Sequence, residues 1–323
     1  MNEVIFLLTD THFGKKQNSI IWLNSQIEFL EKQFIPTVID CAKNNKVKII
    51  HMGDVFDSRS TISTMIATKI IDVFKTICGT PNTELHIVAG NHDFYSPNSD
   101  DIDTLTLLLK GTGAHLHVKD IYLDNDRLYV PWYKWGSDDV QFFIDNKHVN
   151  YIFTHADIVT EKIPYNIKDI KLFSGHLHIP YIKRNIYNIG SCYALDFADS
   201  NHDRGYYVIE GDKVKFIPNK YSIRFWRLYN EDLFDDDKLN TISKQDYIEL
   251  YISQDKMNSD KYVSVINSIT NKFKNTWIIP QANVGLGHEL EKFEGYNIEE
   301  IMEHLIPKEL KEKYNLIKQN YNI

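Results

Sequence analysis

The sequence is poor in cysteine and has no long apolar run, and each shortage argues against a class of protein. Its three cysteines, Cys41, Cys78 and Cys192, lie far apart with no C-x-x-C spacing. We therefore expect reduced, buried thiols and a reducing cytosol, not a disulfide framework. The first apolar stretch, residues 4–8, is too short for a signal peptide or a membrane span. A cytoplasmic protein is predicted, in the host cytoplasm if the source is a phage or virus.

Positive charge is also in short supply. The 323 residues hold 36 Lys and Arg against 44 Asp and Glu, a net charge of -8, which counts against nucleic-acid binding. Basic pairs at 15–16 and 183–184, and Arg224 with Arg227, could contact phosphates or simply lie on a solvated surface. Otherwise the composition, 43% hydrophobic and 25% charged, is typical of a globular protein.

What the sequence does have is a series of apolar runs that each end in metal-ligand side chains. The runs read as strands and alternate with helical patterns, which predicts an α/β fold with ligands at the carboxyl ends of its strands. Five run ends in succession carry such residues: Asp10-Thr11-His12, Gly53-Asp54, Gly90-Asn91-His92-Asp93, His155 and Gly175-His176-Leu177-His178. Extended backbone would place Asp10 and His12 on the same side of their strand. One such block is an ordinary turn, whereas five in order predict a metal site.

In the order D-x-H, GD-x-x-D (Gly53 to Asp57), GNHD, H and GH-x-H, these blocks resemble the calcineurin-like metallophosphoesterase superfamily. The GNHD block, Pro131-Trp132-Tyr133 and Asn188-Ile189-Gly190-Ser191 are most similar to SbcD-type DNA repair and recombination nuclease subunits, including those of bacteriophages. The resemblance implies a four-layer α/β/β/α sandwich with a small α+β capping domain and C-terminal helices.

The resemblance also implies a dinuclear centre in which Asp54 bridges two ions. Asp10, His12, Asp54 and His178 would hold one ion, and Asp54, Asn91, His155 and His176 the other. Oxygen and nitrogen ligands without sulfur suit manganese, iron or zinc, and we expect two Mn²⁺, with Mg²⁺, Fe or Zn as alternatives. In the family, the residue at His92 contacts the scissile phosphate and helps to protonate the leaving oxygen, with Asp93 orienting the imidazole.

Three domains are predicted. Residues 1–220 form the metallophosphoesterase (nuclease) domain. Residues 221–282 form a capping, DNA-binding domain, with strands at 246–253 and 276–280 around a helix. Residues 283–323 form a glycine-bearing linker and two amphipathic helices. In SbcD-like subunits such helices bind the SbcC ATPase, although amphipathic helices more often dock on their own domain.

The leading functional hypothesis is a manganese-dependent DNA exonuclease and endonuclease that acts on double-stranded ends and single strands. By resemblance it would work with an SbcC-like, SMC-type ATPase in double-strand-break repair and recombination, as a homodimer within a heterotetramer, away from membranes. A calcineurin-like phosphatase or small-molecule phosphodiesterase is the enzymatic alternative, but protein phosphatases usually carry GNHE where this chain has GNHD. A non-enzymatic scaffold for the ATPase is disfavoured, because the ligand set is intact.

Overall fold

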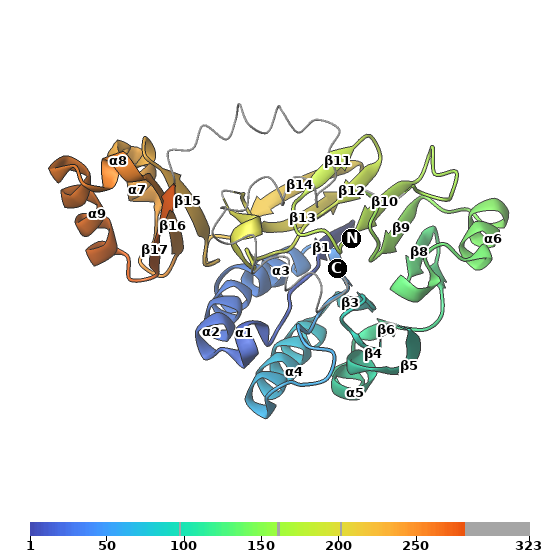
Figure 1. Ribbon diagram of the computed structural model, residues 1–323. Helices are drawn as coiled ribbons and strands as arrows, with labels where there is room; N and C mark the ends of the chain where they lie inside the picture. Colours follow the sequence, from blue (N-terminus) through green and yellow to red (C-terminus); the bar gives the residue numbers. More distant parts are fainter. Residues whose placement is uncertain (97, 160–161, 201, 282–323) are drawn as a thin grey trace, which may run out of the picture.

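Two six-stranded sheets lie face to face between layers of helices in the computed structural model (Figure 1). The structure describes residues 1–96, 98–159, 162–200 and 202–281. The first sheet has the order β14-β13-β1-β2-β3-β6, and the second has the order β11-β12-β10-β9-β8-β7. The two small strands β4 (Phe94–Ser96) and β5 (Ser99–Asp103) form a separate antiparallel pair.

Four strands of the first sheet are parallel, so their carboxyl ends meet at one edge. They are β1 (Glu3–Leu8), β2 (Lys46–Met52), β3 (Thr83–Val88) and β6 (His115–His117). The antiparallel strands β13 (Gly205–Glu210) and β14 (Lys213–Pro218) extend the sheet beyond β1. The first three strands are the predicted ones, within one or two residues at each end.

The second sheet repeats this arrangement. Its parallel strands are β8 (Arg127–Val130), β9 (Tyr151–Thr154), β10 (Lys171–Ser174) and β12 (Ile186–Asn188). Antiparallel edge strands are added by β7 (Tyr122–Asp124) and β11 (Tyr181–Lys183). The turn residues 124–126 between the apolar runs 121–123 and 127–130 predict a hairpin, which β7 and β8 confirm.

Three apolar cores hold the layers together. The first lies between the first sheet and the helices α2 (Ile20–Phe29), α3 (Ile35–Ala42), α4 (Thr64–Cys78) and α5 (Thr104–Leu109). The second lies between the sheets and includes Leu7, Ile50 and Phe153. The third packs Val140 of α6 (Asp138–Asn146) on the outer face of the second sheet. The predicted four-layer α/β/β/α sandwich is confirmed.

The apolar spacing from Ile20 to Phe34 predicts a helix, with Pro36 beginning a fresh turn into Cys41, and the structure confirms both. Helix α2 continues through a π-helical turn, Leu30–Phe34, directly into α3. Pro36 sits in the first turn of α3. The π-helical turn is wider than an α-helical turn and lies just before Pro36, which has no N–H to donate. The chain therefore stays helical through the proline.

A third, three-stranded sheet stands to one side of the sandwich (Figure 1). It consists of β15 (Phe225–Tyr229), β16 (Tyr247–Ser253) and β17 (Thr276–Gln281), all parallel, with α7 (Asp236–Thr241), α8 (Gln254–Met257) and α9 (Asp260–Lys272) in the connections. Strand β15 was not predicted, because its buried residues Phe225 and Leu228 are three positions apart and give no alternating pattern. Trp22 of α2 stacks on Phe225 with 5.8 Å between ring centroids, which joins this unit to the sandwich.

Other sequence predictions have mixed outcomes. The three cysteines are free, but only Cys192 is buried, whereas Cys41 and Cys78 are partly buried. A run of three aspartates such as 235–237 is typical of a solvated loop, but here it begins α7, with the Asp235 side chain accepting from the backbone N–H of Lys238. In the described part of the chain, no helix combines the length and apolarity that crossing a bilayer requires. The predicted linker and helices at 283–323 lie outside the described residues.

Candidate metal centre

Backbone hydrogen bonds join the loop that follows β1 to the loop that follows β2. The Asp10 N–H donates to the Gly53 carbonyl over 3.0 Å, and the His12 N–H donates to the Asp54 carbonyl over 3.1 Å. Both Asp10 and His12 have left-handed backbone, with φ of 51° and 43°, and so does Asp54, with φ of 53°. The prediction that extended backbone aligns Asp10 with His12 is therefore wrong, although the two side chains do meet. Such strained conformations concentrate at functional sites.

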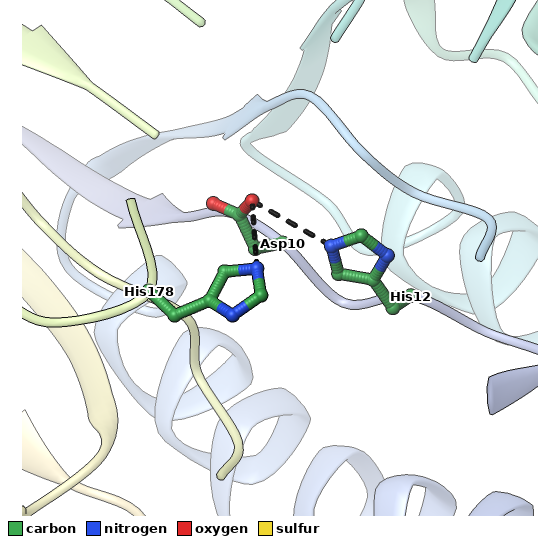
Figure 2. Close-up of side chains that lie close together, drawn as sticks. All are labelled: Asp10, His12 and His178. Carbon is green, nitrogen blue, oxygen red and sulfur yellow. Dashed lines mark ion pairs between the residues drawn. The ribbon is translucent and has the colours of Figure 1, made fainter. Parts of the chain in front are cut away.

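The first group of candidate ligands comprises Asp10, His12 and His178. Figure 2 shows one oxygen of the Asp10 carboxylate facing a nitrogen of each ring. This Oδ1 lies 3.7 Å from His12 Nε2 and 3.9 Å from His178 Nε2. The three donor atoms are close enough to bind one ion. Strands β1 and β10 supply them from opposite sheets.

The second group forms around Asn91, which follows β3. Its Oδ1 lies 3.1 Å from His155 Nε2 and 3.0 Å from His176 Nδ1. The other nitrogen of His155, Nδ1, lies 2.7 Å from the Met52 carbonyl, which can only accept and therefore fixes the proton on Nδ1. Nε2 is thereby left to face Asp54 Oδ2 at 3.3 Å.

Asp54 lies between the two groups. Its Oδ2 is 3.7 Å from His12 Nε2 on one side and 3.3 Å from His155 Nε2 on the other. The side chain is almost fully buried, with the residue 2% exposed. Its position matches that of a carboxylate shared by two ions, and it lies among the other six residues expected to be ligands.

Two further carboxylates, absent from the predicted site, face the outer nitrogens of ligand histidines. Asp57 Oδ1 lies 3.3 Å from His12 Nδ1, and Asp199 Oδ2 lies 3.7 Å from His178 Nδ1. Asp199 is in turn paired with the buried Arg204 at 2.8 Å. Carboxylates in these positions orient metal-binding imidazoles. Asp57 could have been found as the last residue of the GD-x-x-D block, whereas nothing in the sequence marks Asp199.

His92 lies beside both groups. Its ring Nδ1 is 2.7 Å from the Asp57 carbonyl, and its backbone N–H donates to Asp54 Oδ1 over 2.7 Å. The ring centroid is 5.0 Å from that of His12. Because a carbonyl only accepts, Nδ1 carries a proton and Nε2 is the nitrogen available to a substrate.

Asp93 does not orient His92, and that prediction is wrong. Its carboxylate is fully buried and accepts backbone N–H groups from Asp54, Val55 and Gly90, at 2.9 to 3.0 Å. Burial, followed by the charge of Asp54, raises the pKa of Asp93 to about 7. The side chain thus ties the loop after β3 to the loop after β2, which positions Asp54.

The electrostatics of the cluster fit bound cations. Burial by itself raises the pKa of Asp10, but the imidazoles around it lower that pKa to about 2. Burial lowers the pKa of His12, and the nearby carboxylates of Asp10 and Asp57 overcome this and raise it to about 10. Asp10 Oδ1 and both His12 ring nitrogens are buried and have no hydrogen-bond partner among the described residues. Divalent cations would replace the imidazole protons as counter-charges for the carboxylates.

This chain matches the calcineurin-like phosphoesterase family pattern over residues 4–180, a span that contains every candidate ligand. The chain belongs to that family. The match confirms the predicted family and the predicted class of activity, the hydrolysis of phosphate esters. Members of the family use divalent metals.

The phosphoesterase is similar to exonuclease subunit 1 of Enterobacteria phage T4, with 24% identity over 234 residues that cover 67% of each chain. Among solved structures it matches the Pseudomonas putida nuclease MPE with 13% identity, over 66% of this chain and 87% of that one. The TM-score of 0.33 is too low to support a conclusion.

Proposed function

We propose that this phosphoesterase is a dinuclear, manganese-dependent DNA exonuclease and endonuclease. The observation that carries the proposal is the position of Asp54 Oδ2 between the two ligand groups, 3.7 Å from His12 Nε2 and 3.3 Å from His155 Nε2. Two divalent cations, when bound, would supply the positive charge that a phosphodiester requires and lower the pKa of an attacking water. The similarity to a phage exonuclease subunit favours DNA over small esters as the substrate.

The other roles in the proposed reaction belong to residues of the protein. As an imidazolium protonated on both nitrogens, His92 would contact the scissile phosphate and pass the Nε2 proton to the leaving oxygen, while its Nδ1–H stays on the Asp57 carbonyl. Asp93 would hold Asp54 in place through the backbone. Residues 1–220 would form the nuclease domain, and residues 221–282 would cap it and help to hold DNA.

A manganese titration on a labelled blunt duplex tests the proposal, with p-nitrophenyl phosphate and bis-p-nitrophenyl phosphate in parallel. We expect the wild-type protein to degrade the duplex and Asp54→Asn to be inactive. Turnover of the small esters alone would instead support the phosphatase or small-molecule phosphodiesterase, unless an added ATPase partner restores cutting. No turnover of any substrate, with or without the partner, would favour the scaffold.

The proposed partners are a second copy of this chain and an SbcC-like ATPase. An apolar patch supports the homodimer: Tyr95, Ile102 and Leu107 are 58%, 63% and 76% exposed and line one hollow. The amphipathic sequence pattern at 298–317 supports ATPase binding. Deleting residues 296–323 should abolish ATPase binding in a pull-down while manganese-dependent cleavage of short DNA continues. Undiminished binding after the deletion would contradict the tail assignment.

A further inference from the structure

We propose that the hollow lined by Trp132, Tyr133 and Trp135 binds the base of the nucleotide next to the scissile phosphate. The inference rests on the proposed function, which places a phosphodiester at the ligand cluster. It adds a second site, which recognises the nucleoside and not the phosphate.

The hollow adjoins the ligand cluster directly. It has a volume of about 380 Å³, and its wall includes His176, whose Nδ1 faces Asn91. Trp132 and Tyr133 belong to a single 3₁₀ turn, Trp132–Lys134, which follows β8. One nucleotide could therefore place its phosphate at the ligands and its base against the aromatic rings of the hollow.

The aromatic side chains are fixed before any ligand arrives. The backbone N–H of Trp132 donates to the Ala89 carbonyl over 3.0 Å. The Trp132 ring contacts the Tyr133 ring edge-on, with 4.8 Å between the ring centroids. Trp135 meets Tyr165 edge-on at 5.1 Å. Both indoles are only partly buried. Rigid aromatic surfaces bind with a small loss of conformational entropy.

The chemistry of the wall selects a base over other groups. Aromatic rings stack on nucleobases of any sequence. Asp157 also lines the hollow, and the negative charge of its carboxylate disfavours a phosphate there. A second hollow of about 490 Å³ borders His176 and His178 on another side, but its wall is mainly aliphatic, with Leu177, Ile179 and Pro180. The aromatic hollow is the better match for a flat, uncharged ring.

The test compares DNA with and without a base at the nucleotide to be removed. The full-length protein with manganese is given an oligonucleotide that carries either thymine or an abasic tetrahydrofuran residue at that position. We expect wild type to cleave the abasic substrate about tenfold more slowly, since one stacked base contributes on that order. Trp135→Ala should cleave the thymine substrate about as slowly as the abasic one. Phe142→Ala, which removes an aromatic ring that is 57% exposed on α6, should keep the wild-type preference.

Two additional variants keep the test decisive. Trp135→Phe retains a flat ring and should restore most of the preference for the base, whereas a folding defect would also lower the manganese content measured by elemental analysis. A full wild-type preference in both Trp135→Ala and Trp132→Ala would overturn the proposal. So would a preference that disappears in Ile179→Ala alone, because the base would then occupy the aliphatic hollow.

The outcome can be separated from that of the proposed function. If wild type cuts no DNA, the nuclease proposal fails, and thymidine 5′-(p-nitrophenyl phosphate) is compared with methyl p-nitrophenyl phosphate. Faster turnover of the thymidine ester, lost in Trp135→Ala, would retain the base site in a nucleotide phosphodiesterase. Equal turnover of both esters by wild type would refute the base site as well.

Discussion

Asp57 contacts two histidines, one through its side chain and the other through its backbone. Its carboxylate lies 3.3 Å from His12 Nδ1, while its backbone carbonyl lies 2.7 Å from His92 Nδ1. Lys15 Nζ, 3.3 Å from the same carboxylate, provides a counter-charge. The orientation of a candidate ligand and that of the candidate acid thus depend on one residue.

His92→Asn tests the role of the candidate acid. The variant removes an imidazole that the proposed ligand sets do not need, so cleavage should fall by about 10²-fold or more. Manganese content, measured by elemental analysis, should equal that of wild type. Because His92 also lies within reach of His12 and Asp54, a loss of bound manganese would instead make it a ligand.

At the residue scale, the sequence predicted which side chains gather but not all of their contacts. Residue type and order were enough to bring Asp10, Asn91 and His178 to one site. The direction of a side chain after a strand end depends on the loop conformation, which spacing does not encode. Asp93 consequently points at backbone N–H groups and away from the His92 ring.

At the scale of elements, the close approach of two loops requires a residue without a side chain. A Cβ on Gly90 would overlap both the backbone N and the carboxylate of Asp54. Gly90→Ala should therefore displace Asp54, and isothermal titration calorimetry should find much weaker manganese binding. Gly111→Ala is the matched control, because a Cβ there meets no described atom within 4 Å. Equal affinity in the two variants would contradict this account.

A buried histidine pair on β3 and β6 makes stability depend on pH. His86 Nδ1 lies 3.0 Å from His117 Nε2, and burial lowers the pKa of each to about 3. A histidine in the unfolded chain has a pKa near 6.5. Below that pH the unfolded state therefore binds protons at these two histidines, whereas the folded state does not. The free energy of unfolding should therefore fall by about 1.4 kcal/mol per pH unit for each histidine as the pH drops from 6.5 towards 3.

Urea unfolding at pH 6.5 and pH 5 measures this dependence. The double variant His86→Gln, His117→Gln should lose less stability on acidification than wild type. His148→Gln removes an exposed histidine and should follow wild type. An unchanged slope in the double variant would show that the pair does not cause the acid sensitivity.

At the scale of the whole molecule, the candidate ligands join the two sheets. Asp10, Asp54 and Asn91 follow strands of the first sheet, whereas His155 and His178 follow strands of the second. The gathering of ligands was predictable because parallel strands place their carboxyl ends together, whereas the four layers were predicted from the family resemblance. The third sheet was predicted only in part, since β15 lacks an alternating pattern and its register depends on contacts with distant strands.

Ions bound between the sheets should stabilise the fold. Manganese at about 100 times its dissociation constant should add about 2.7 kcal/mol to the free energy of unfolding. For a domain of this size, that raises the melting temperature by about 2–4 °C per kcal/mol in calorimetry. Asp54→Asn should show little of this rise. An identical melting temperature of wild type in manganese and in chelator would contradict the prediction.

The division of the ligands between two sheets also has a consequence for synthesis. A ribosome makes Asp10, Asp54 and Asn91 early, but His176 and His178 emerge only after the second sheet has been started. Strand β13, which pairs with β1, is made later still. A nascent chain therefore carries an incomplete ligand set until β10 and the residues that follow it have been made, so the candidate metal centre cannot form on the first three strands alone.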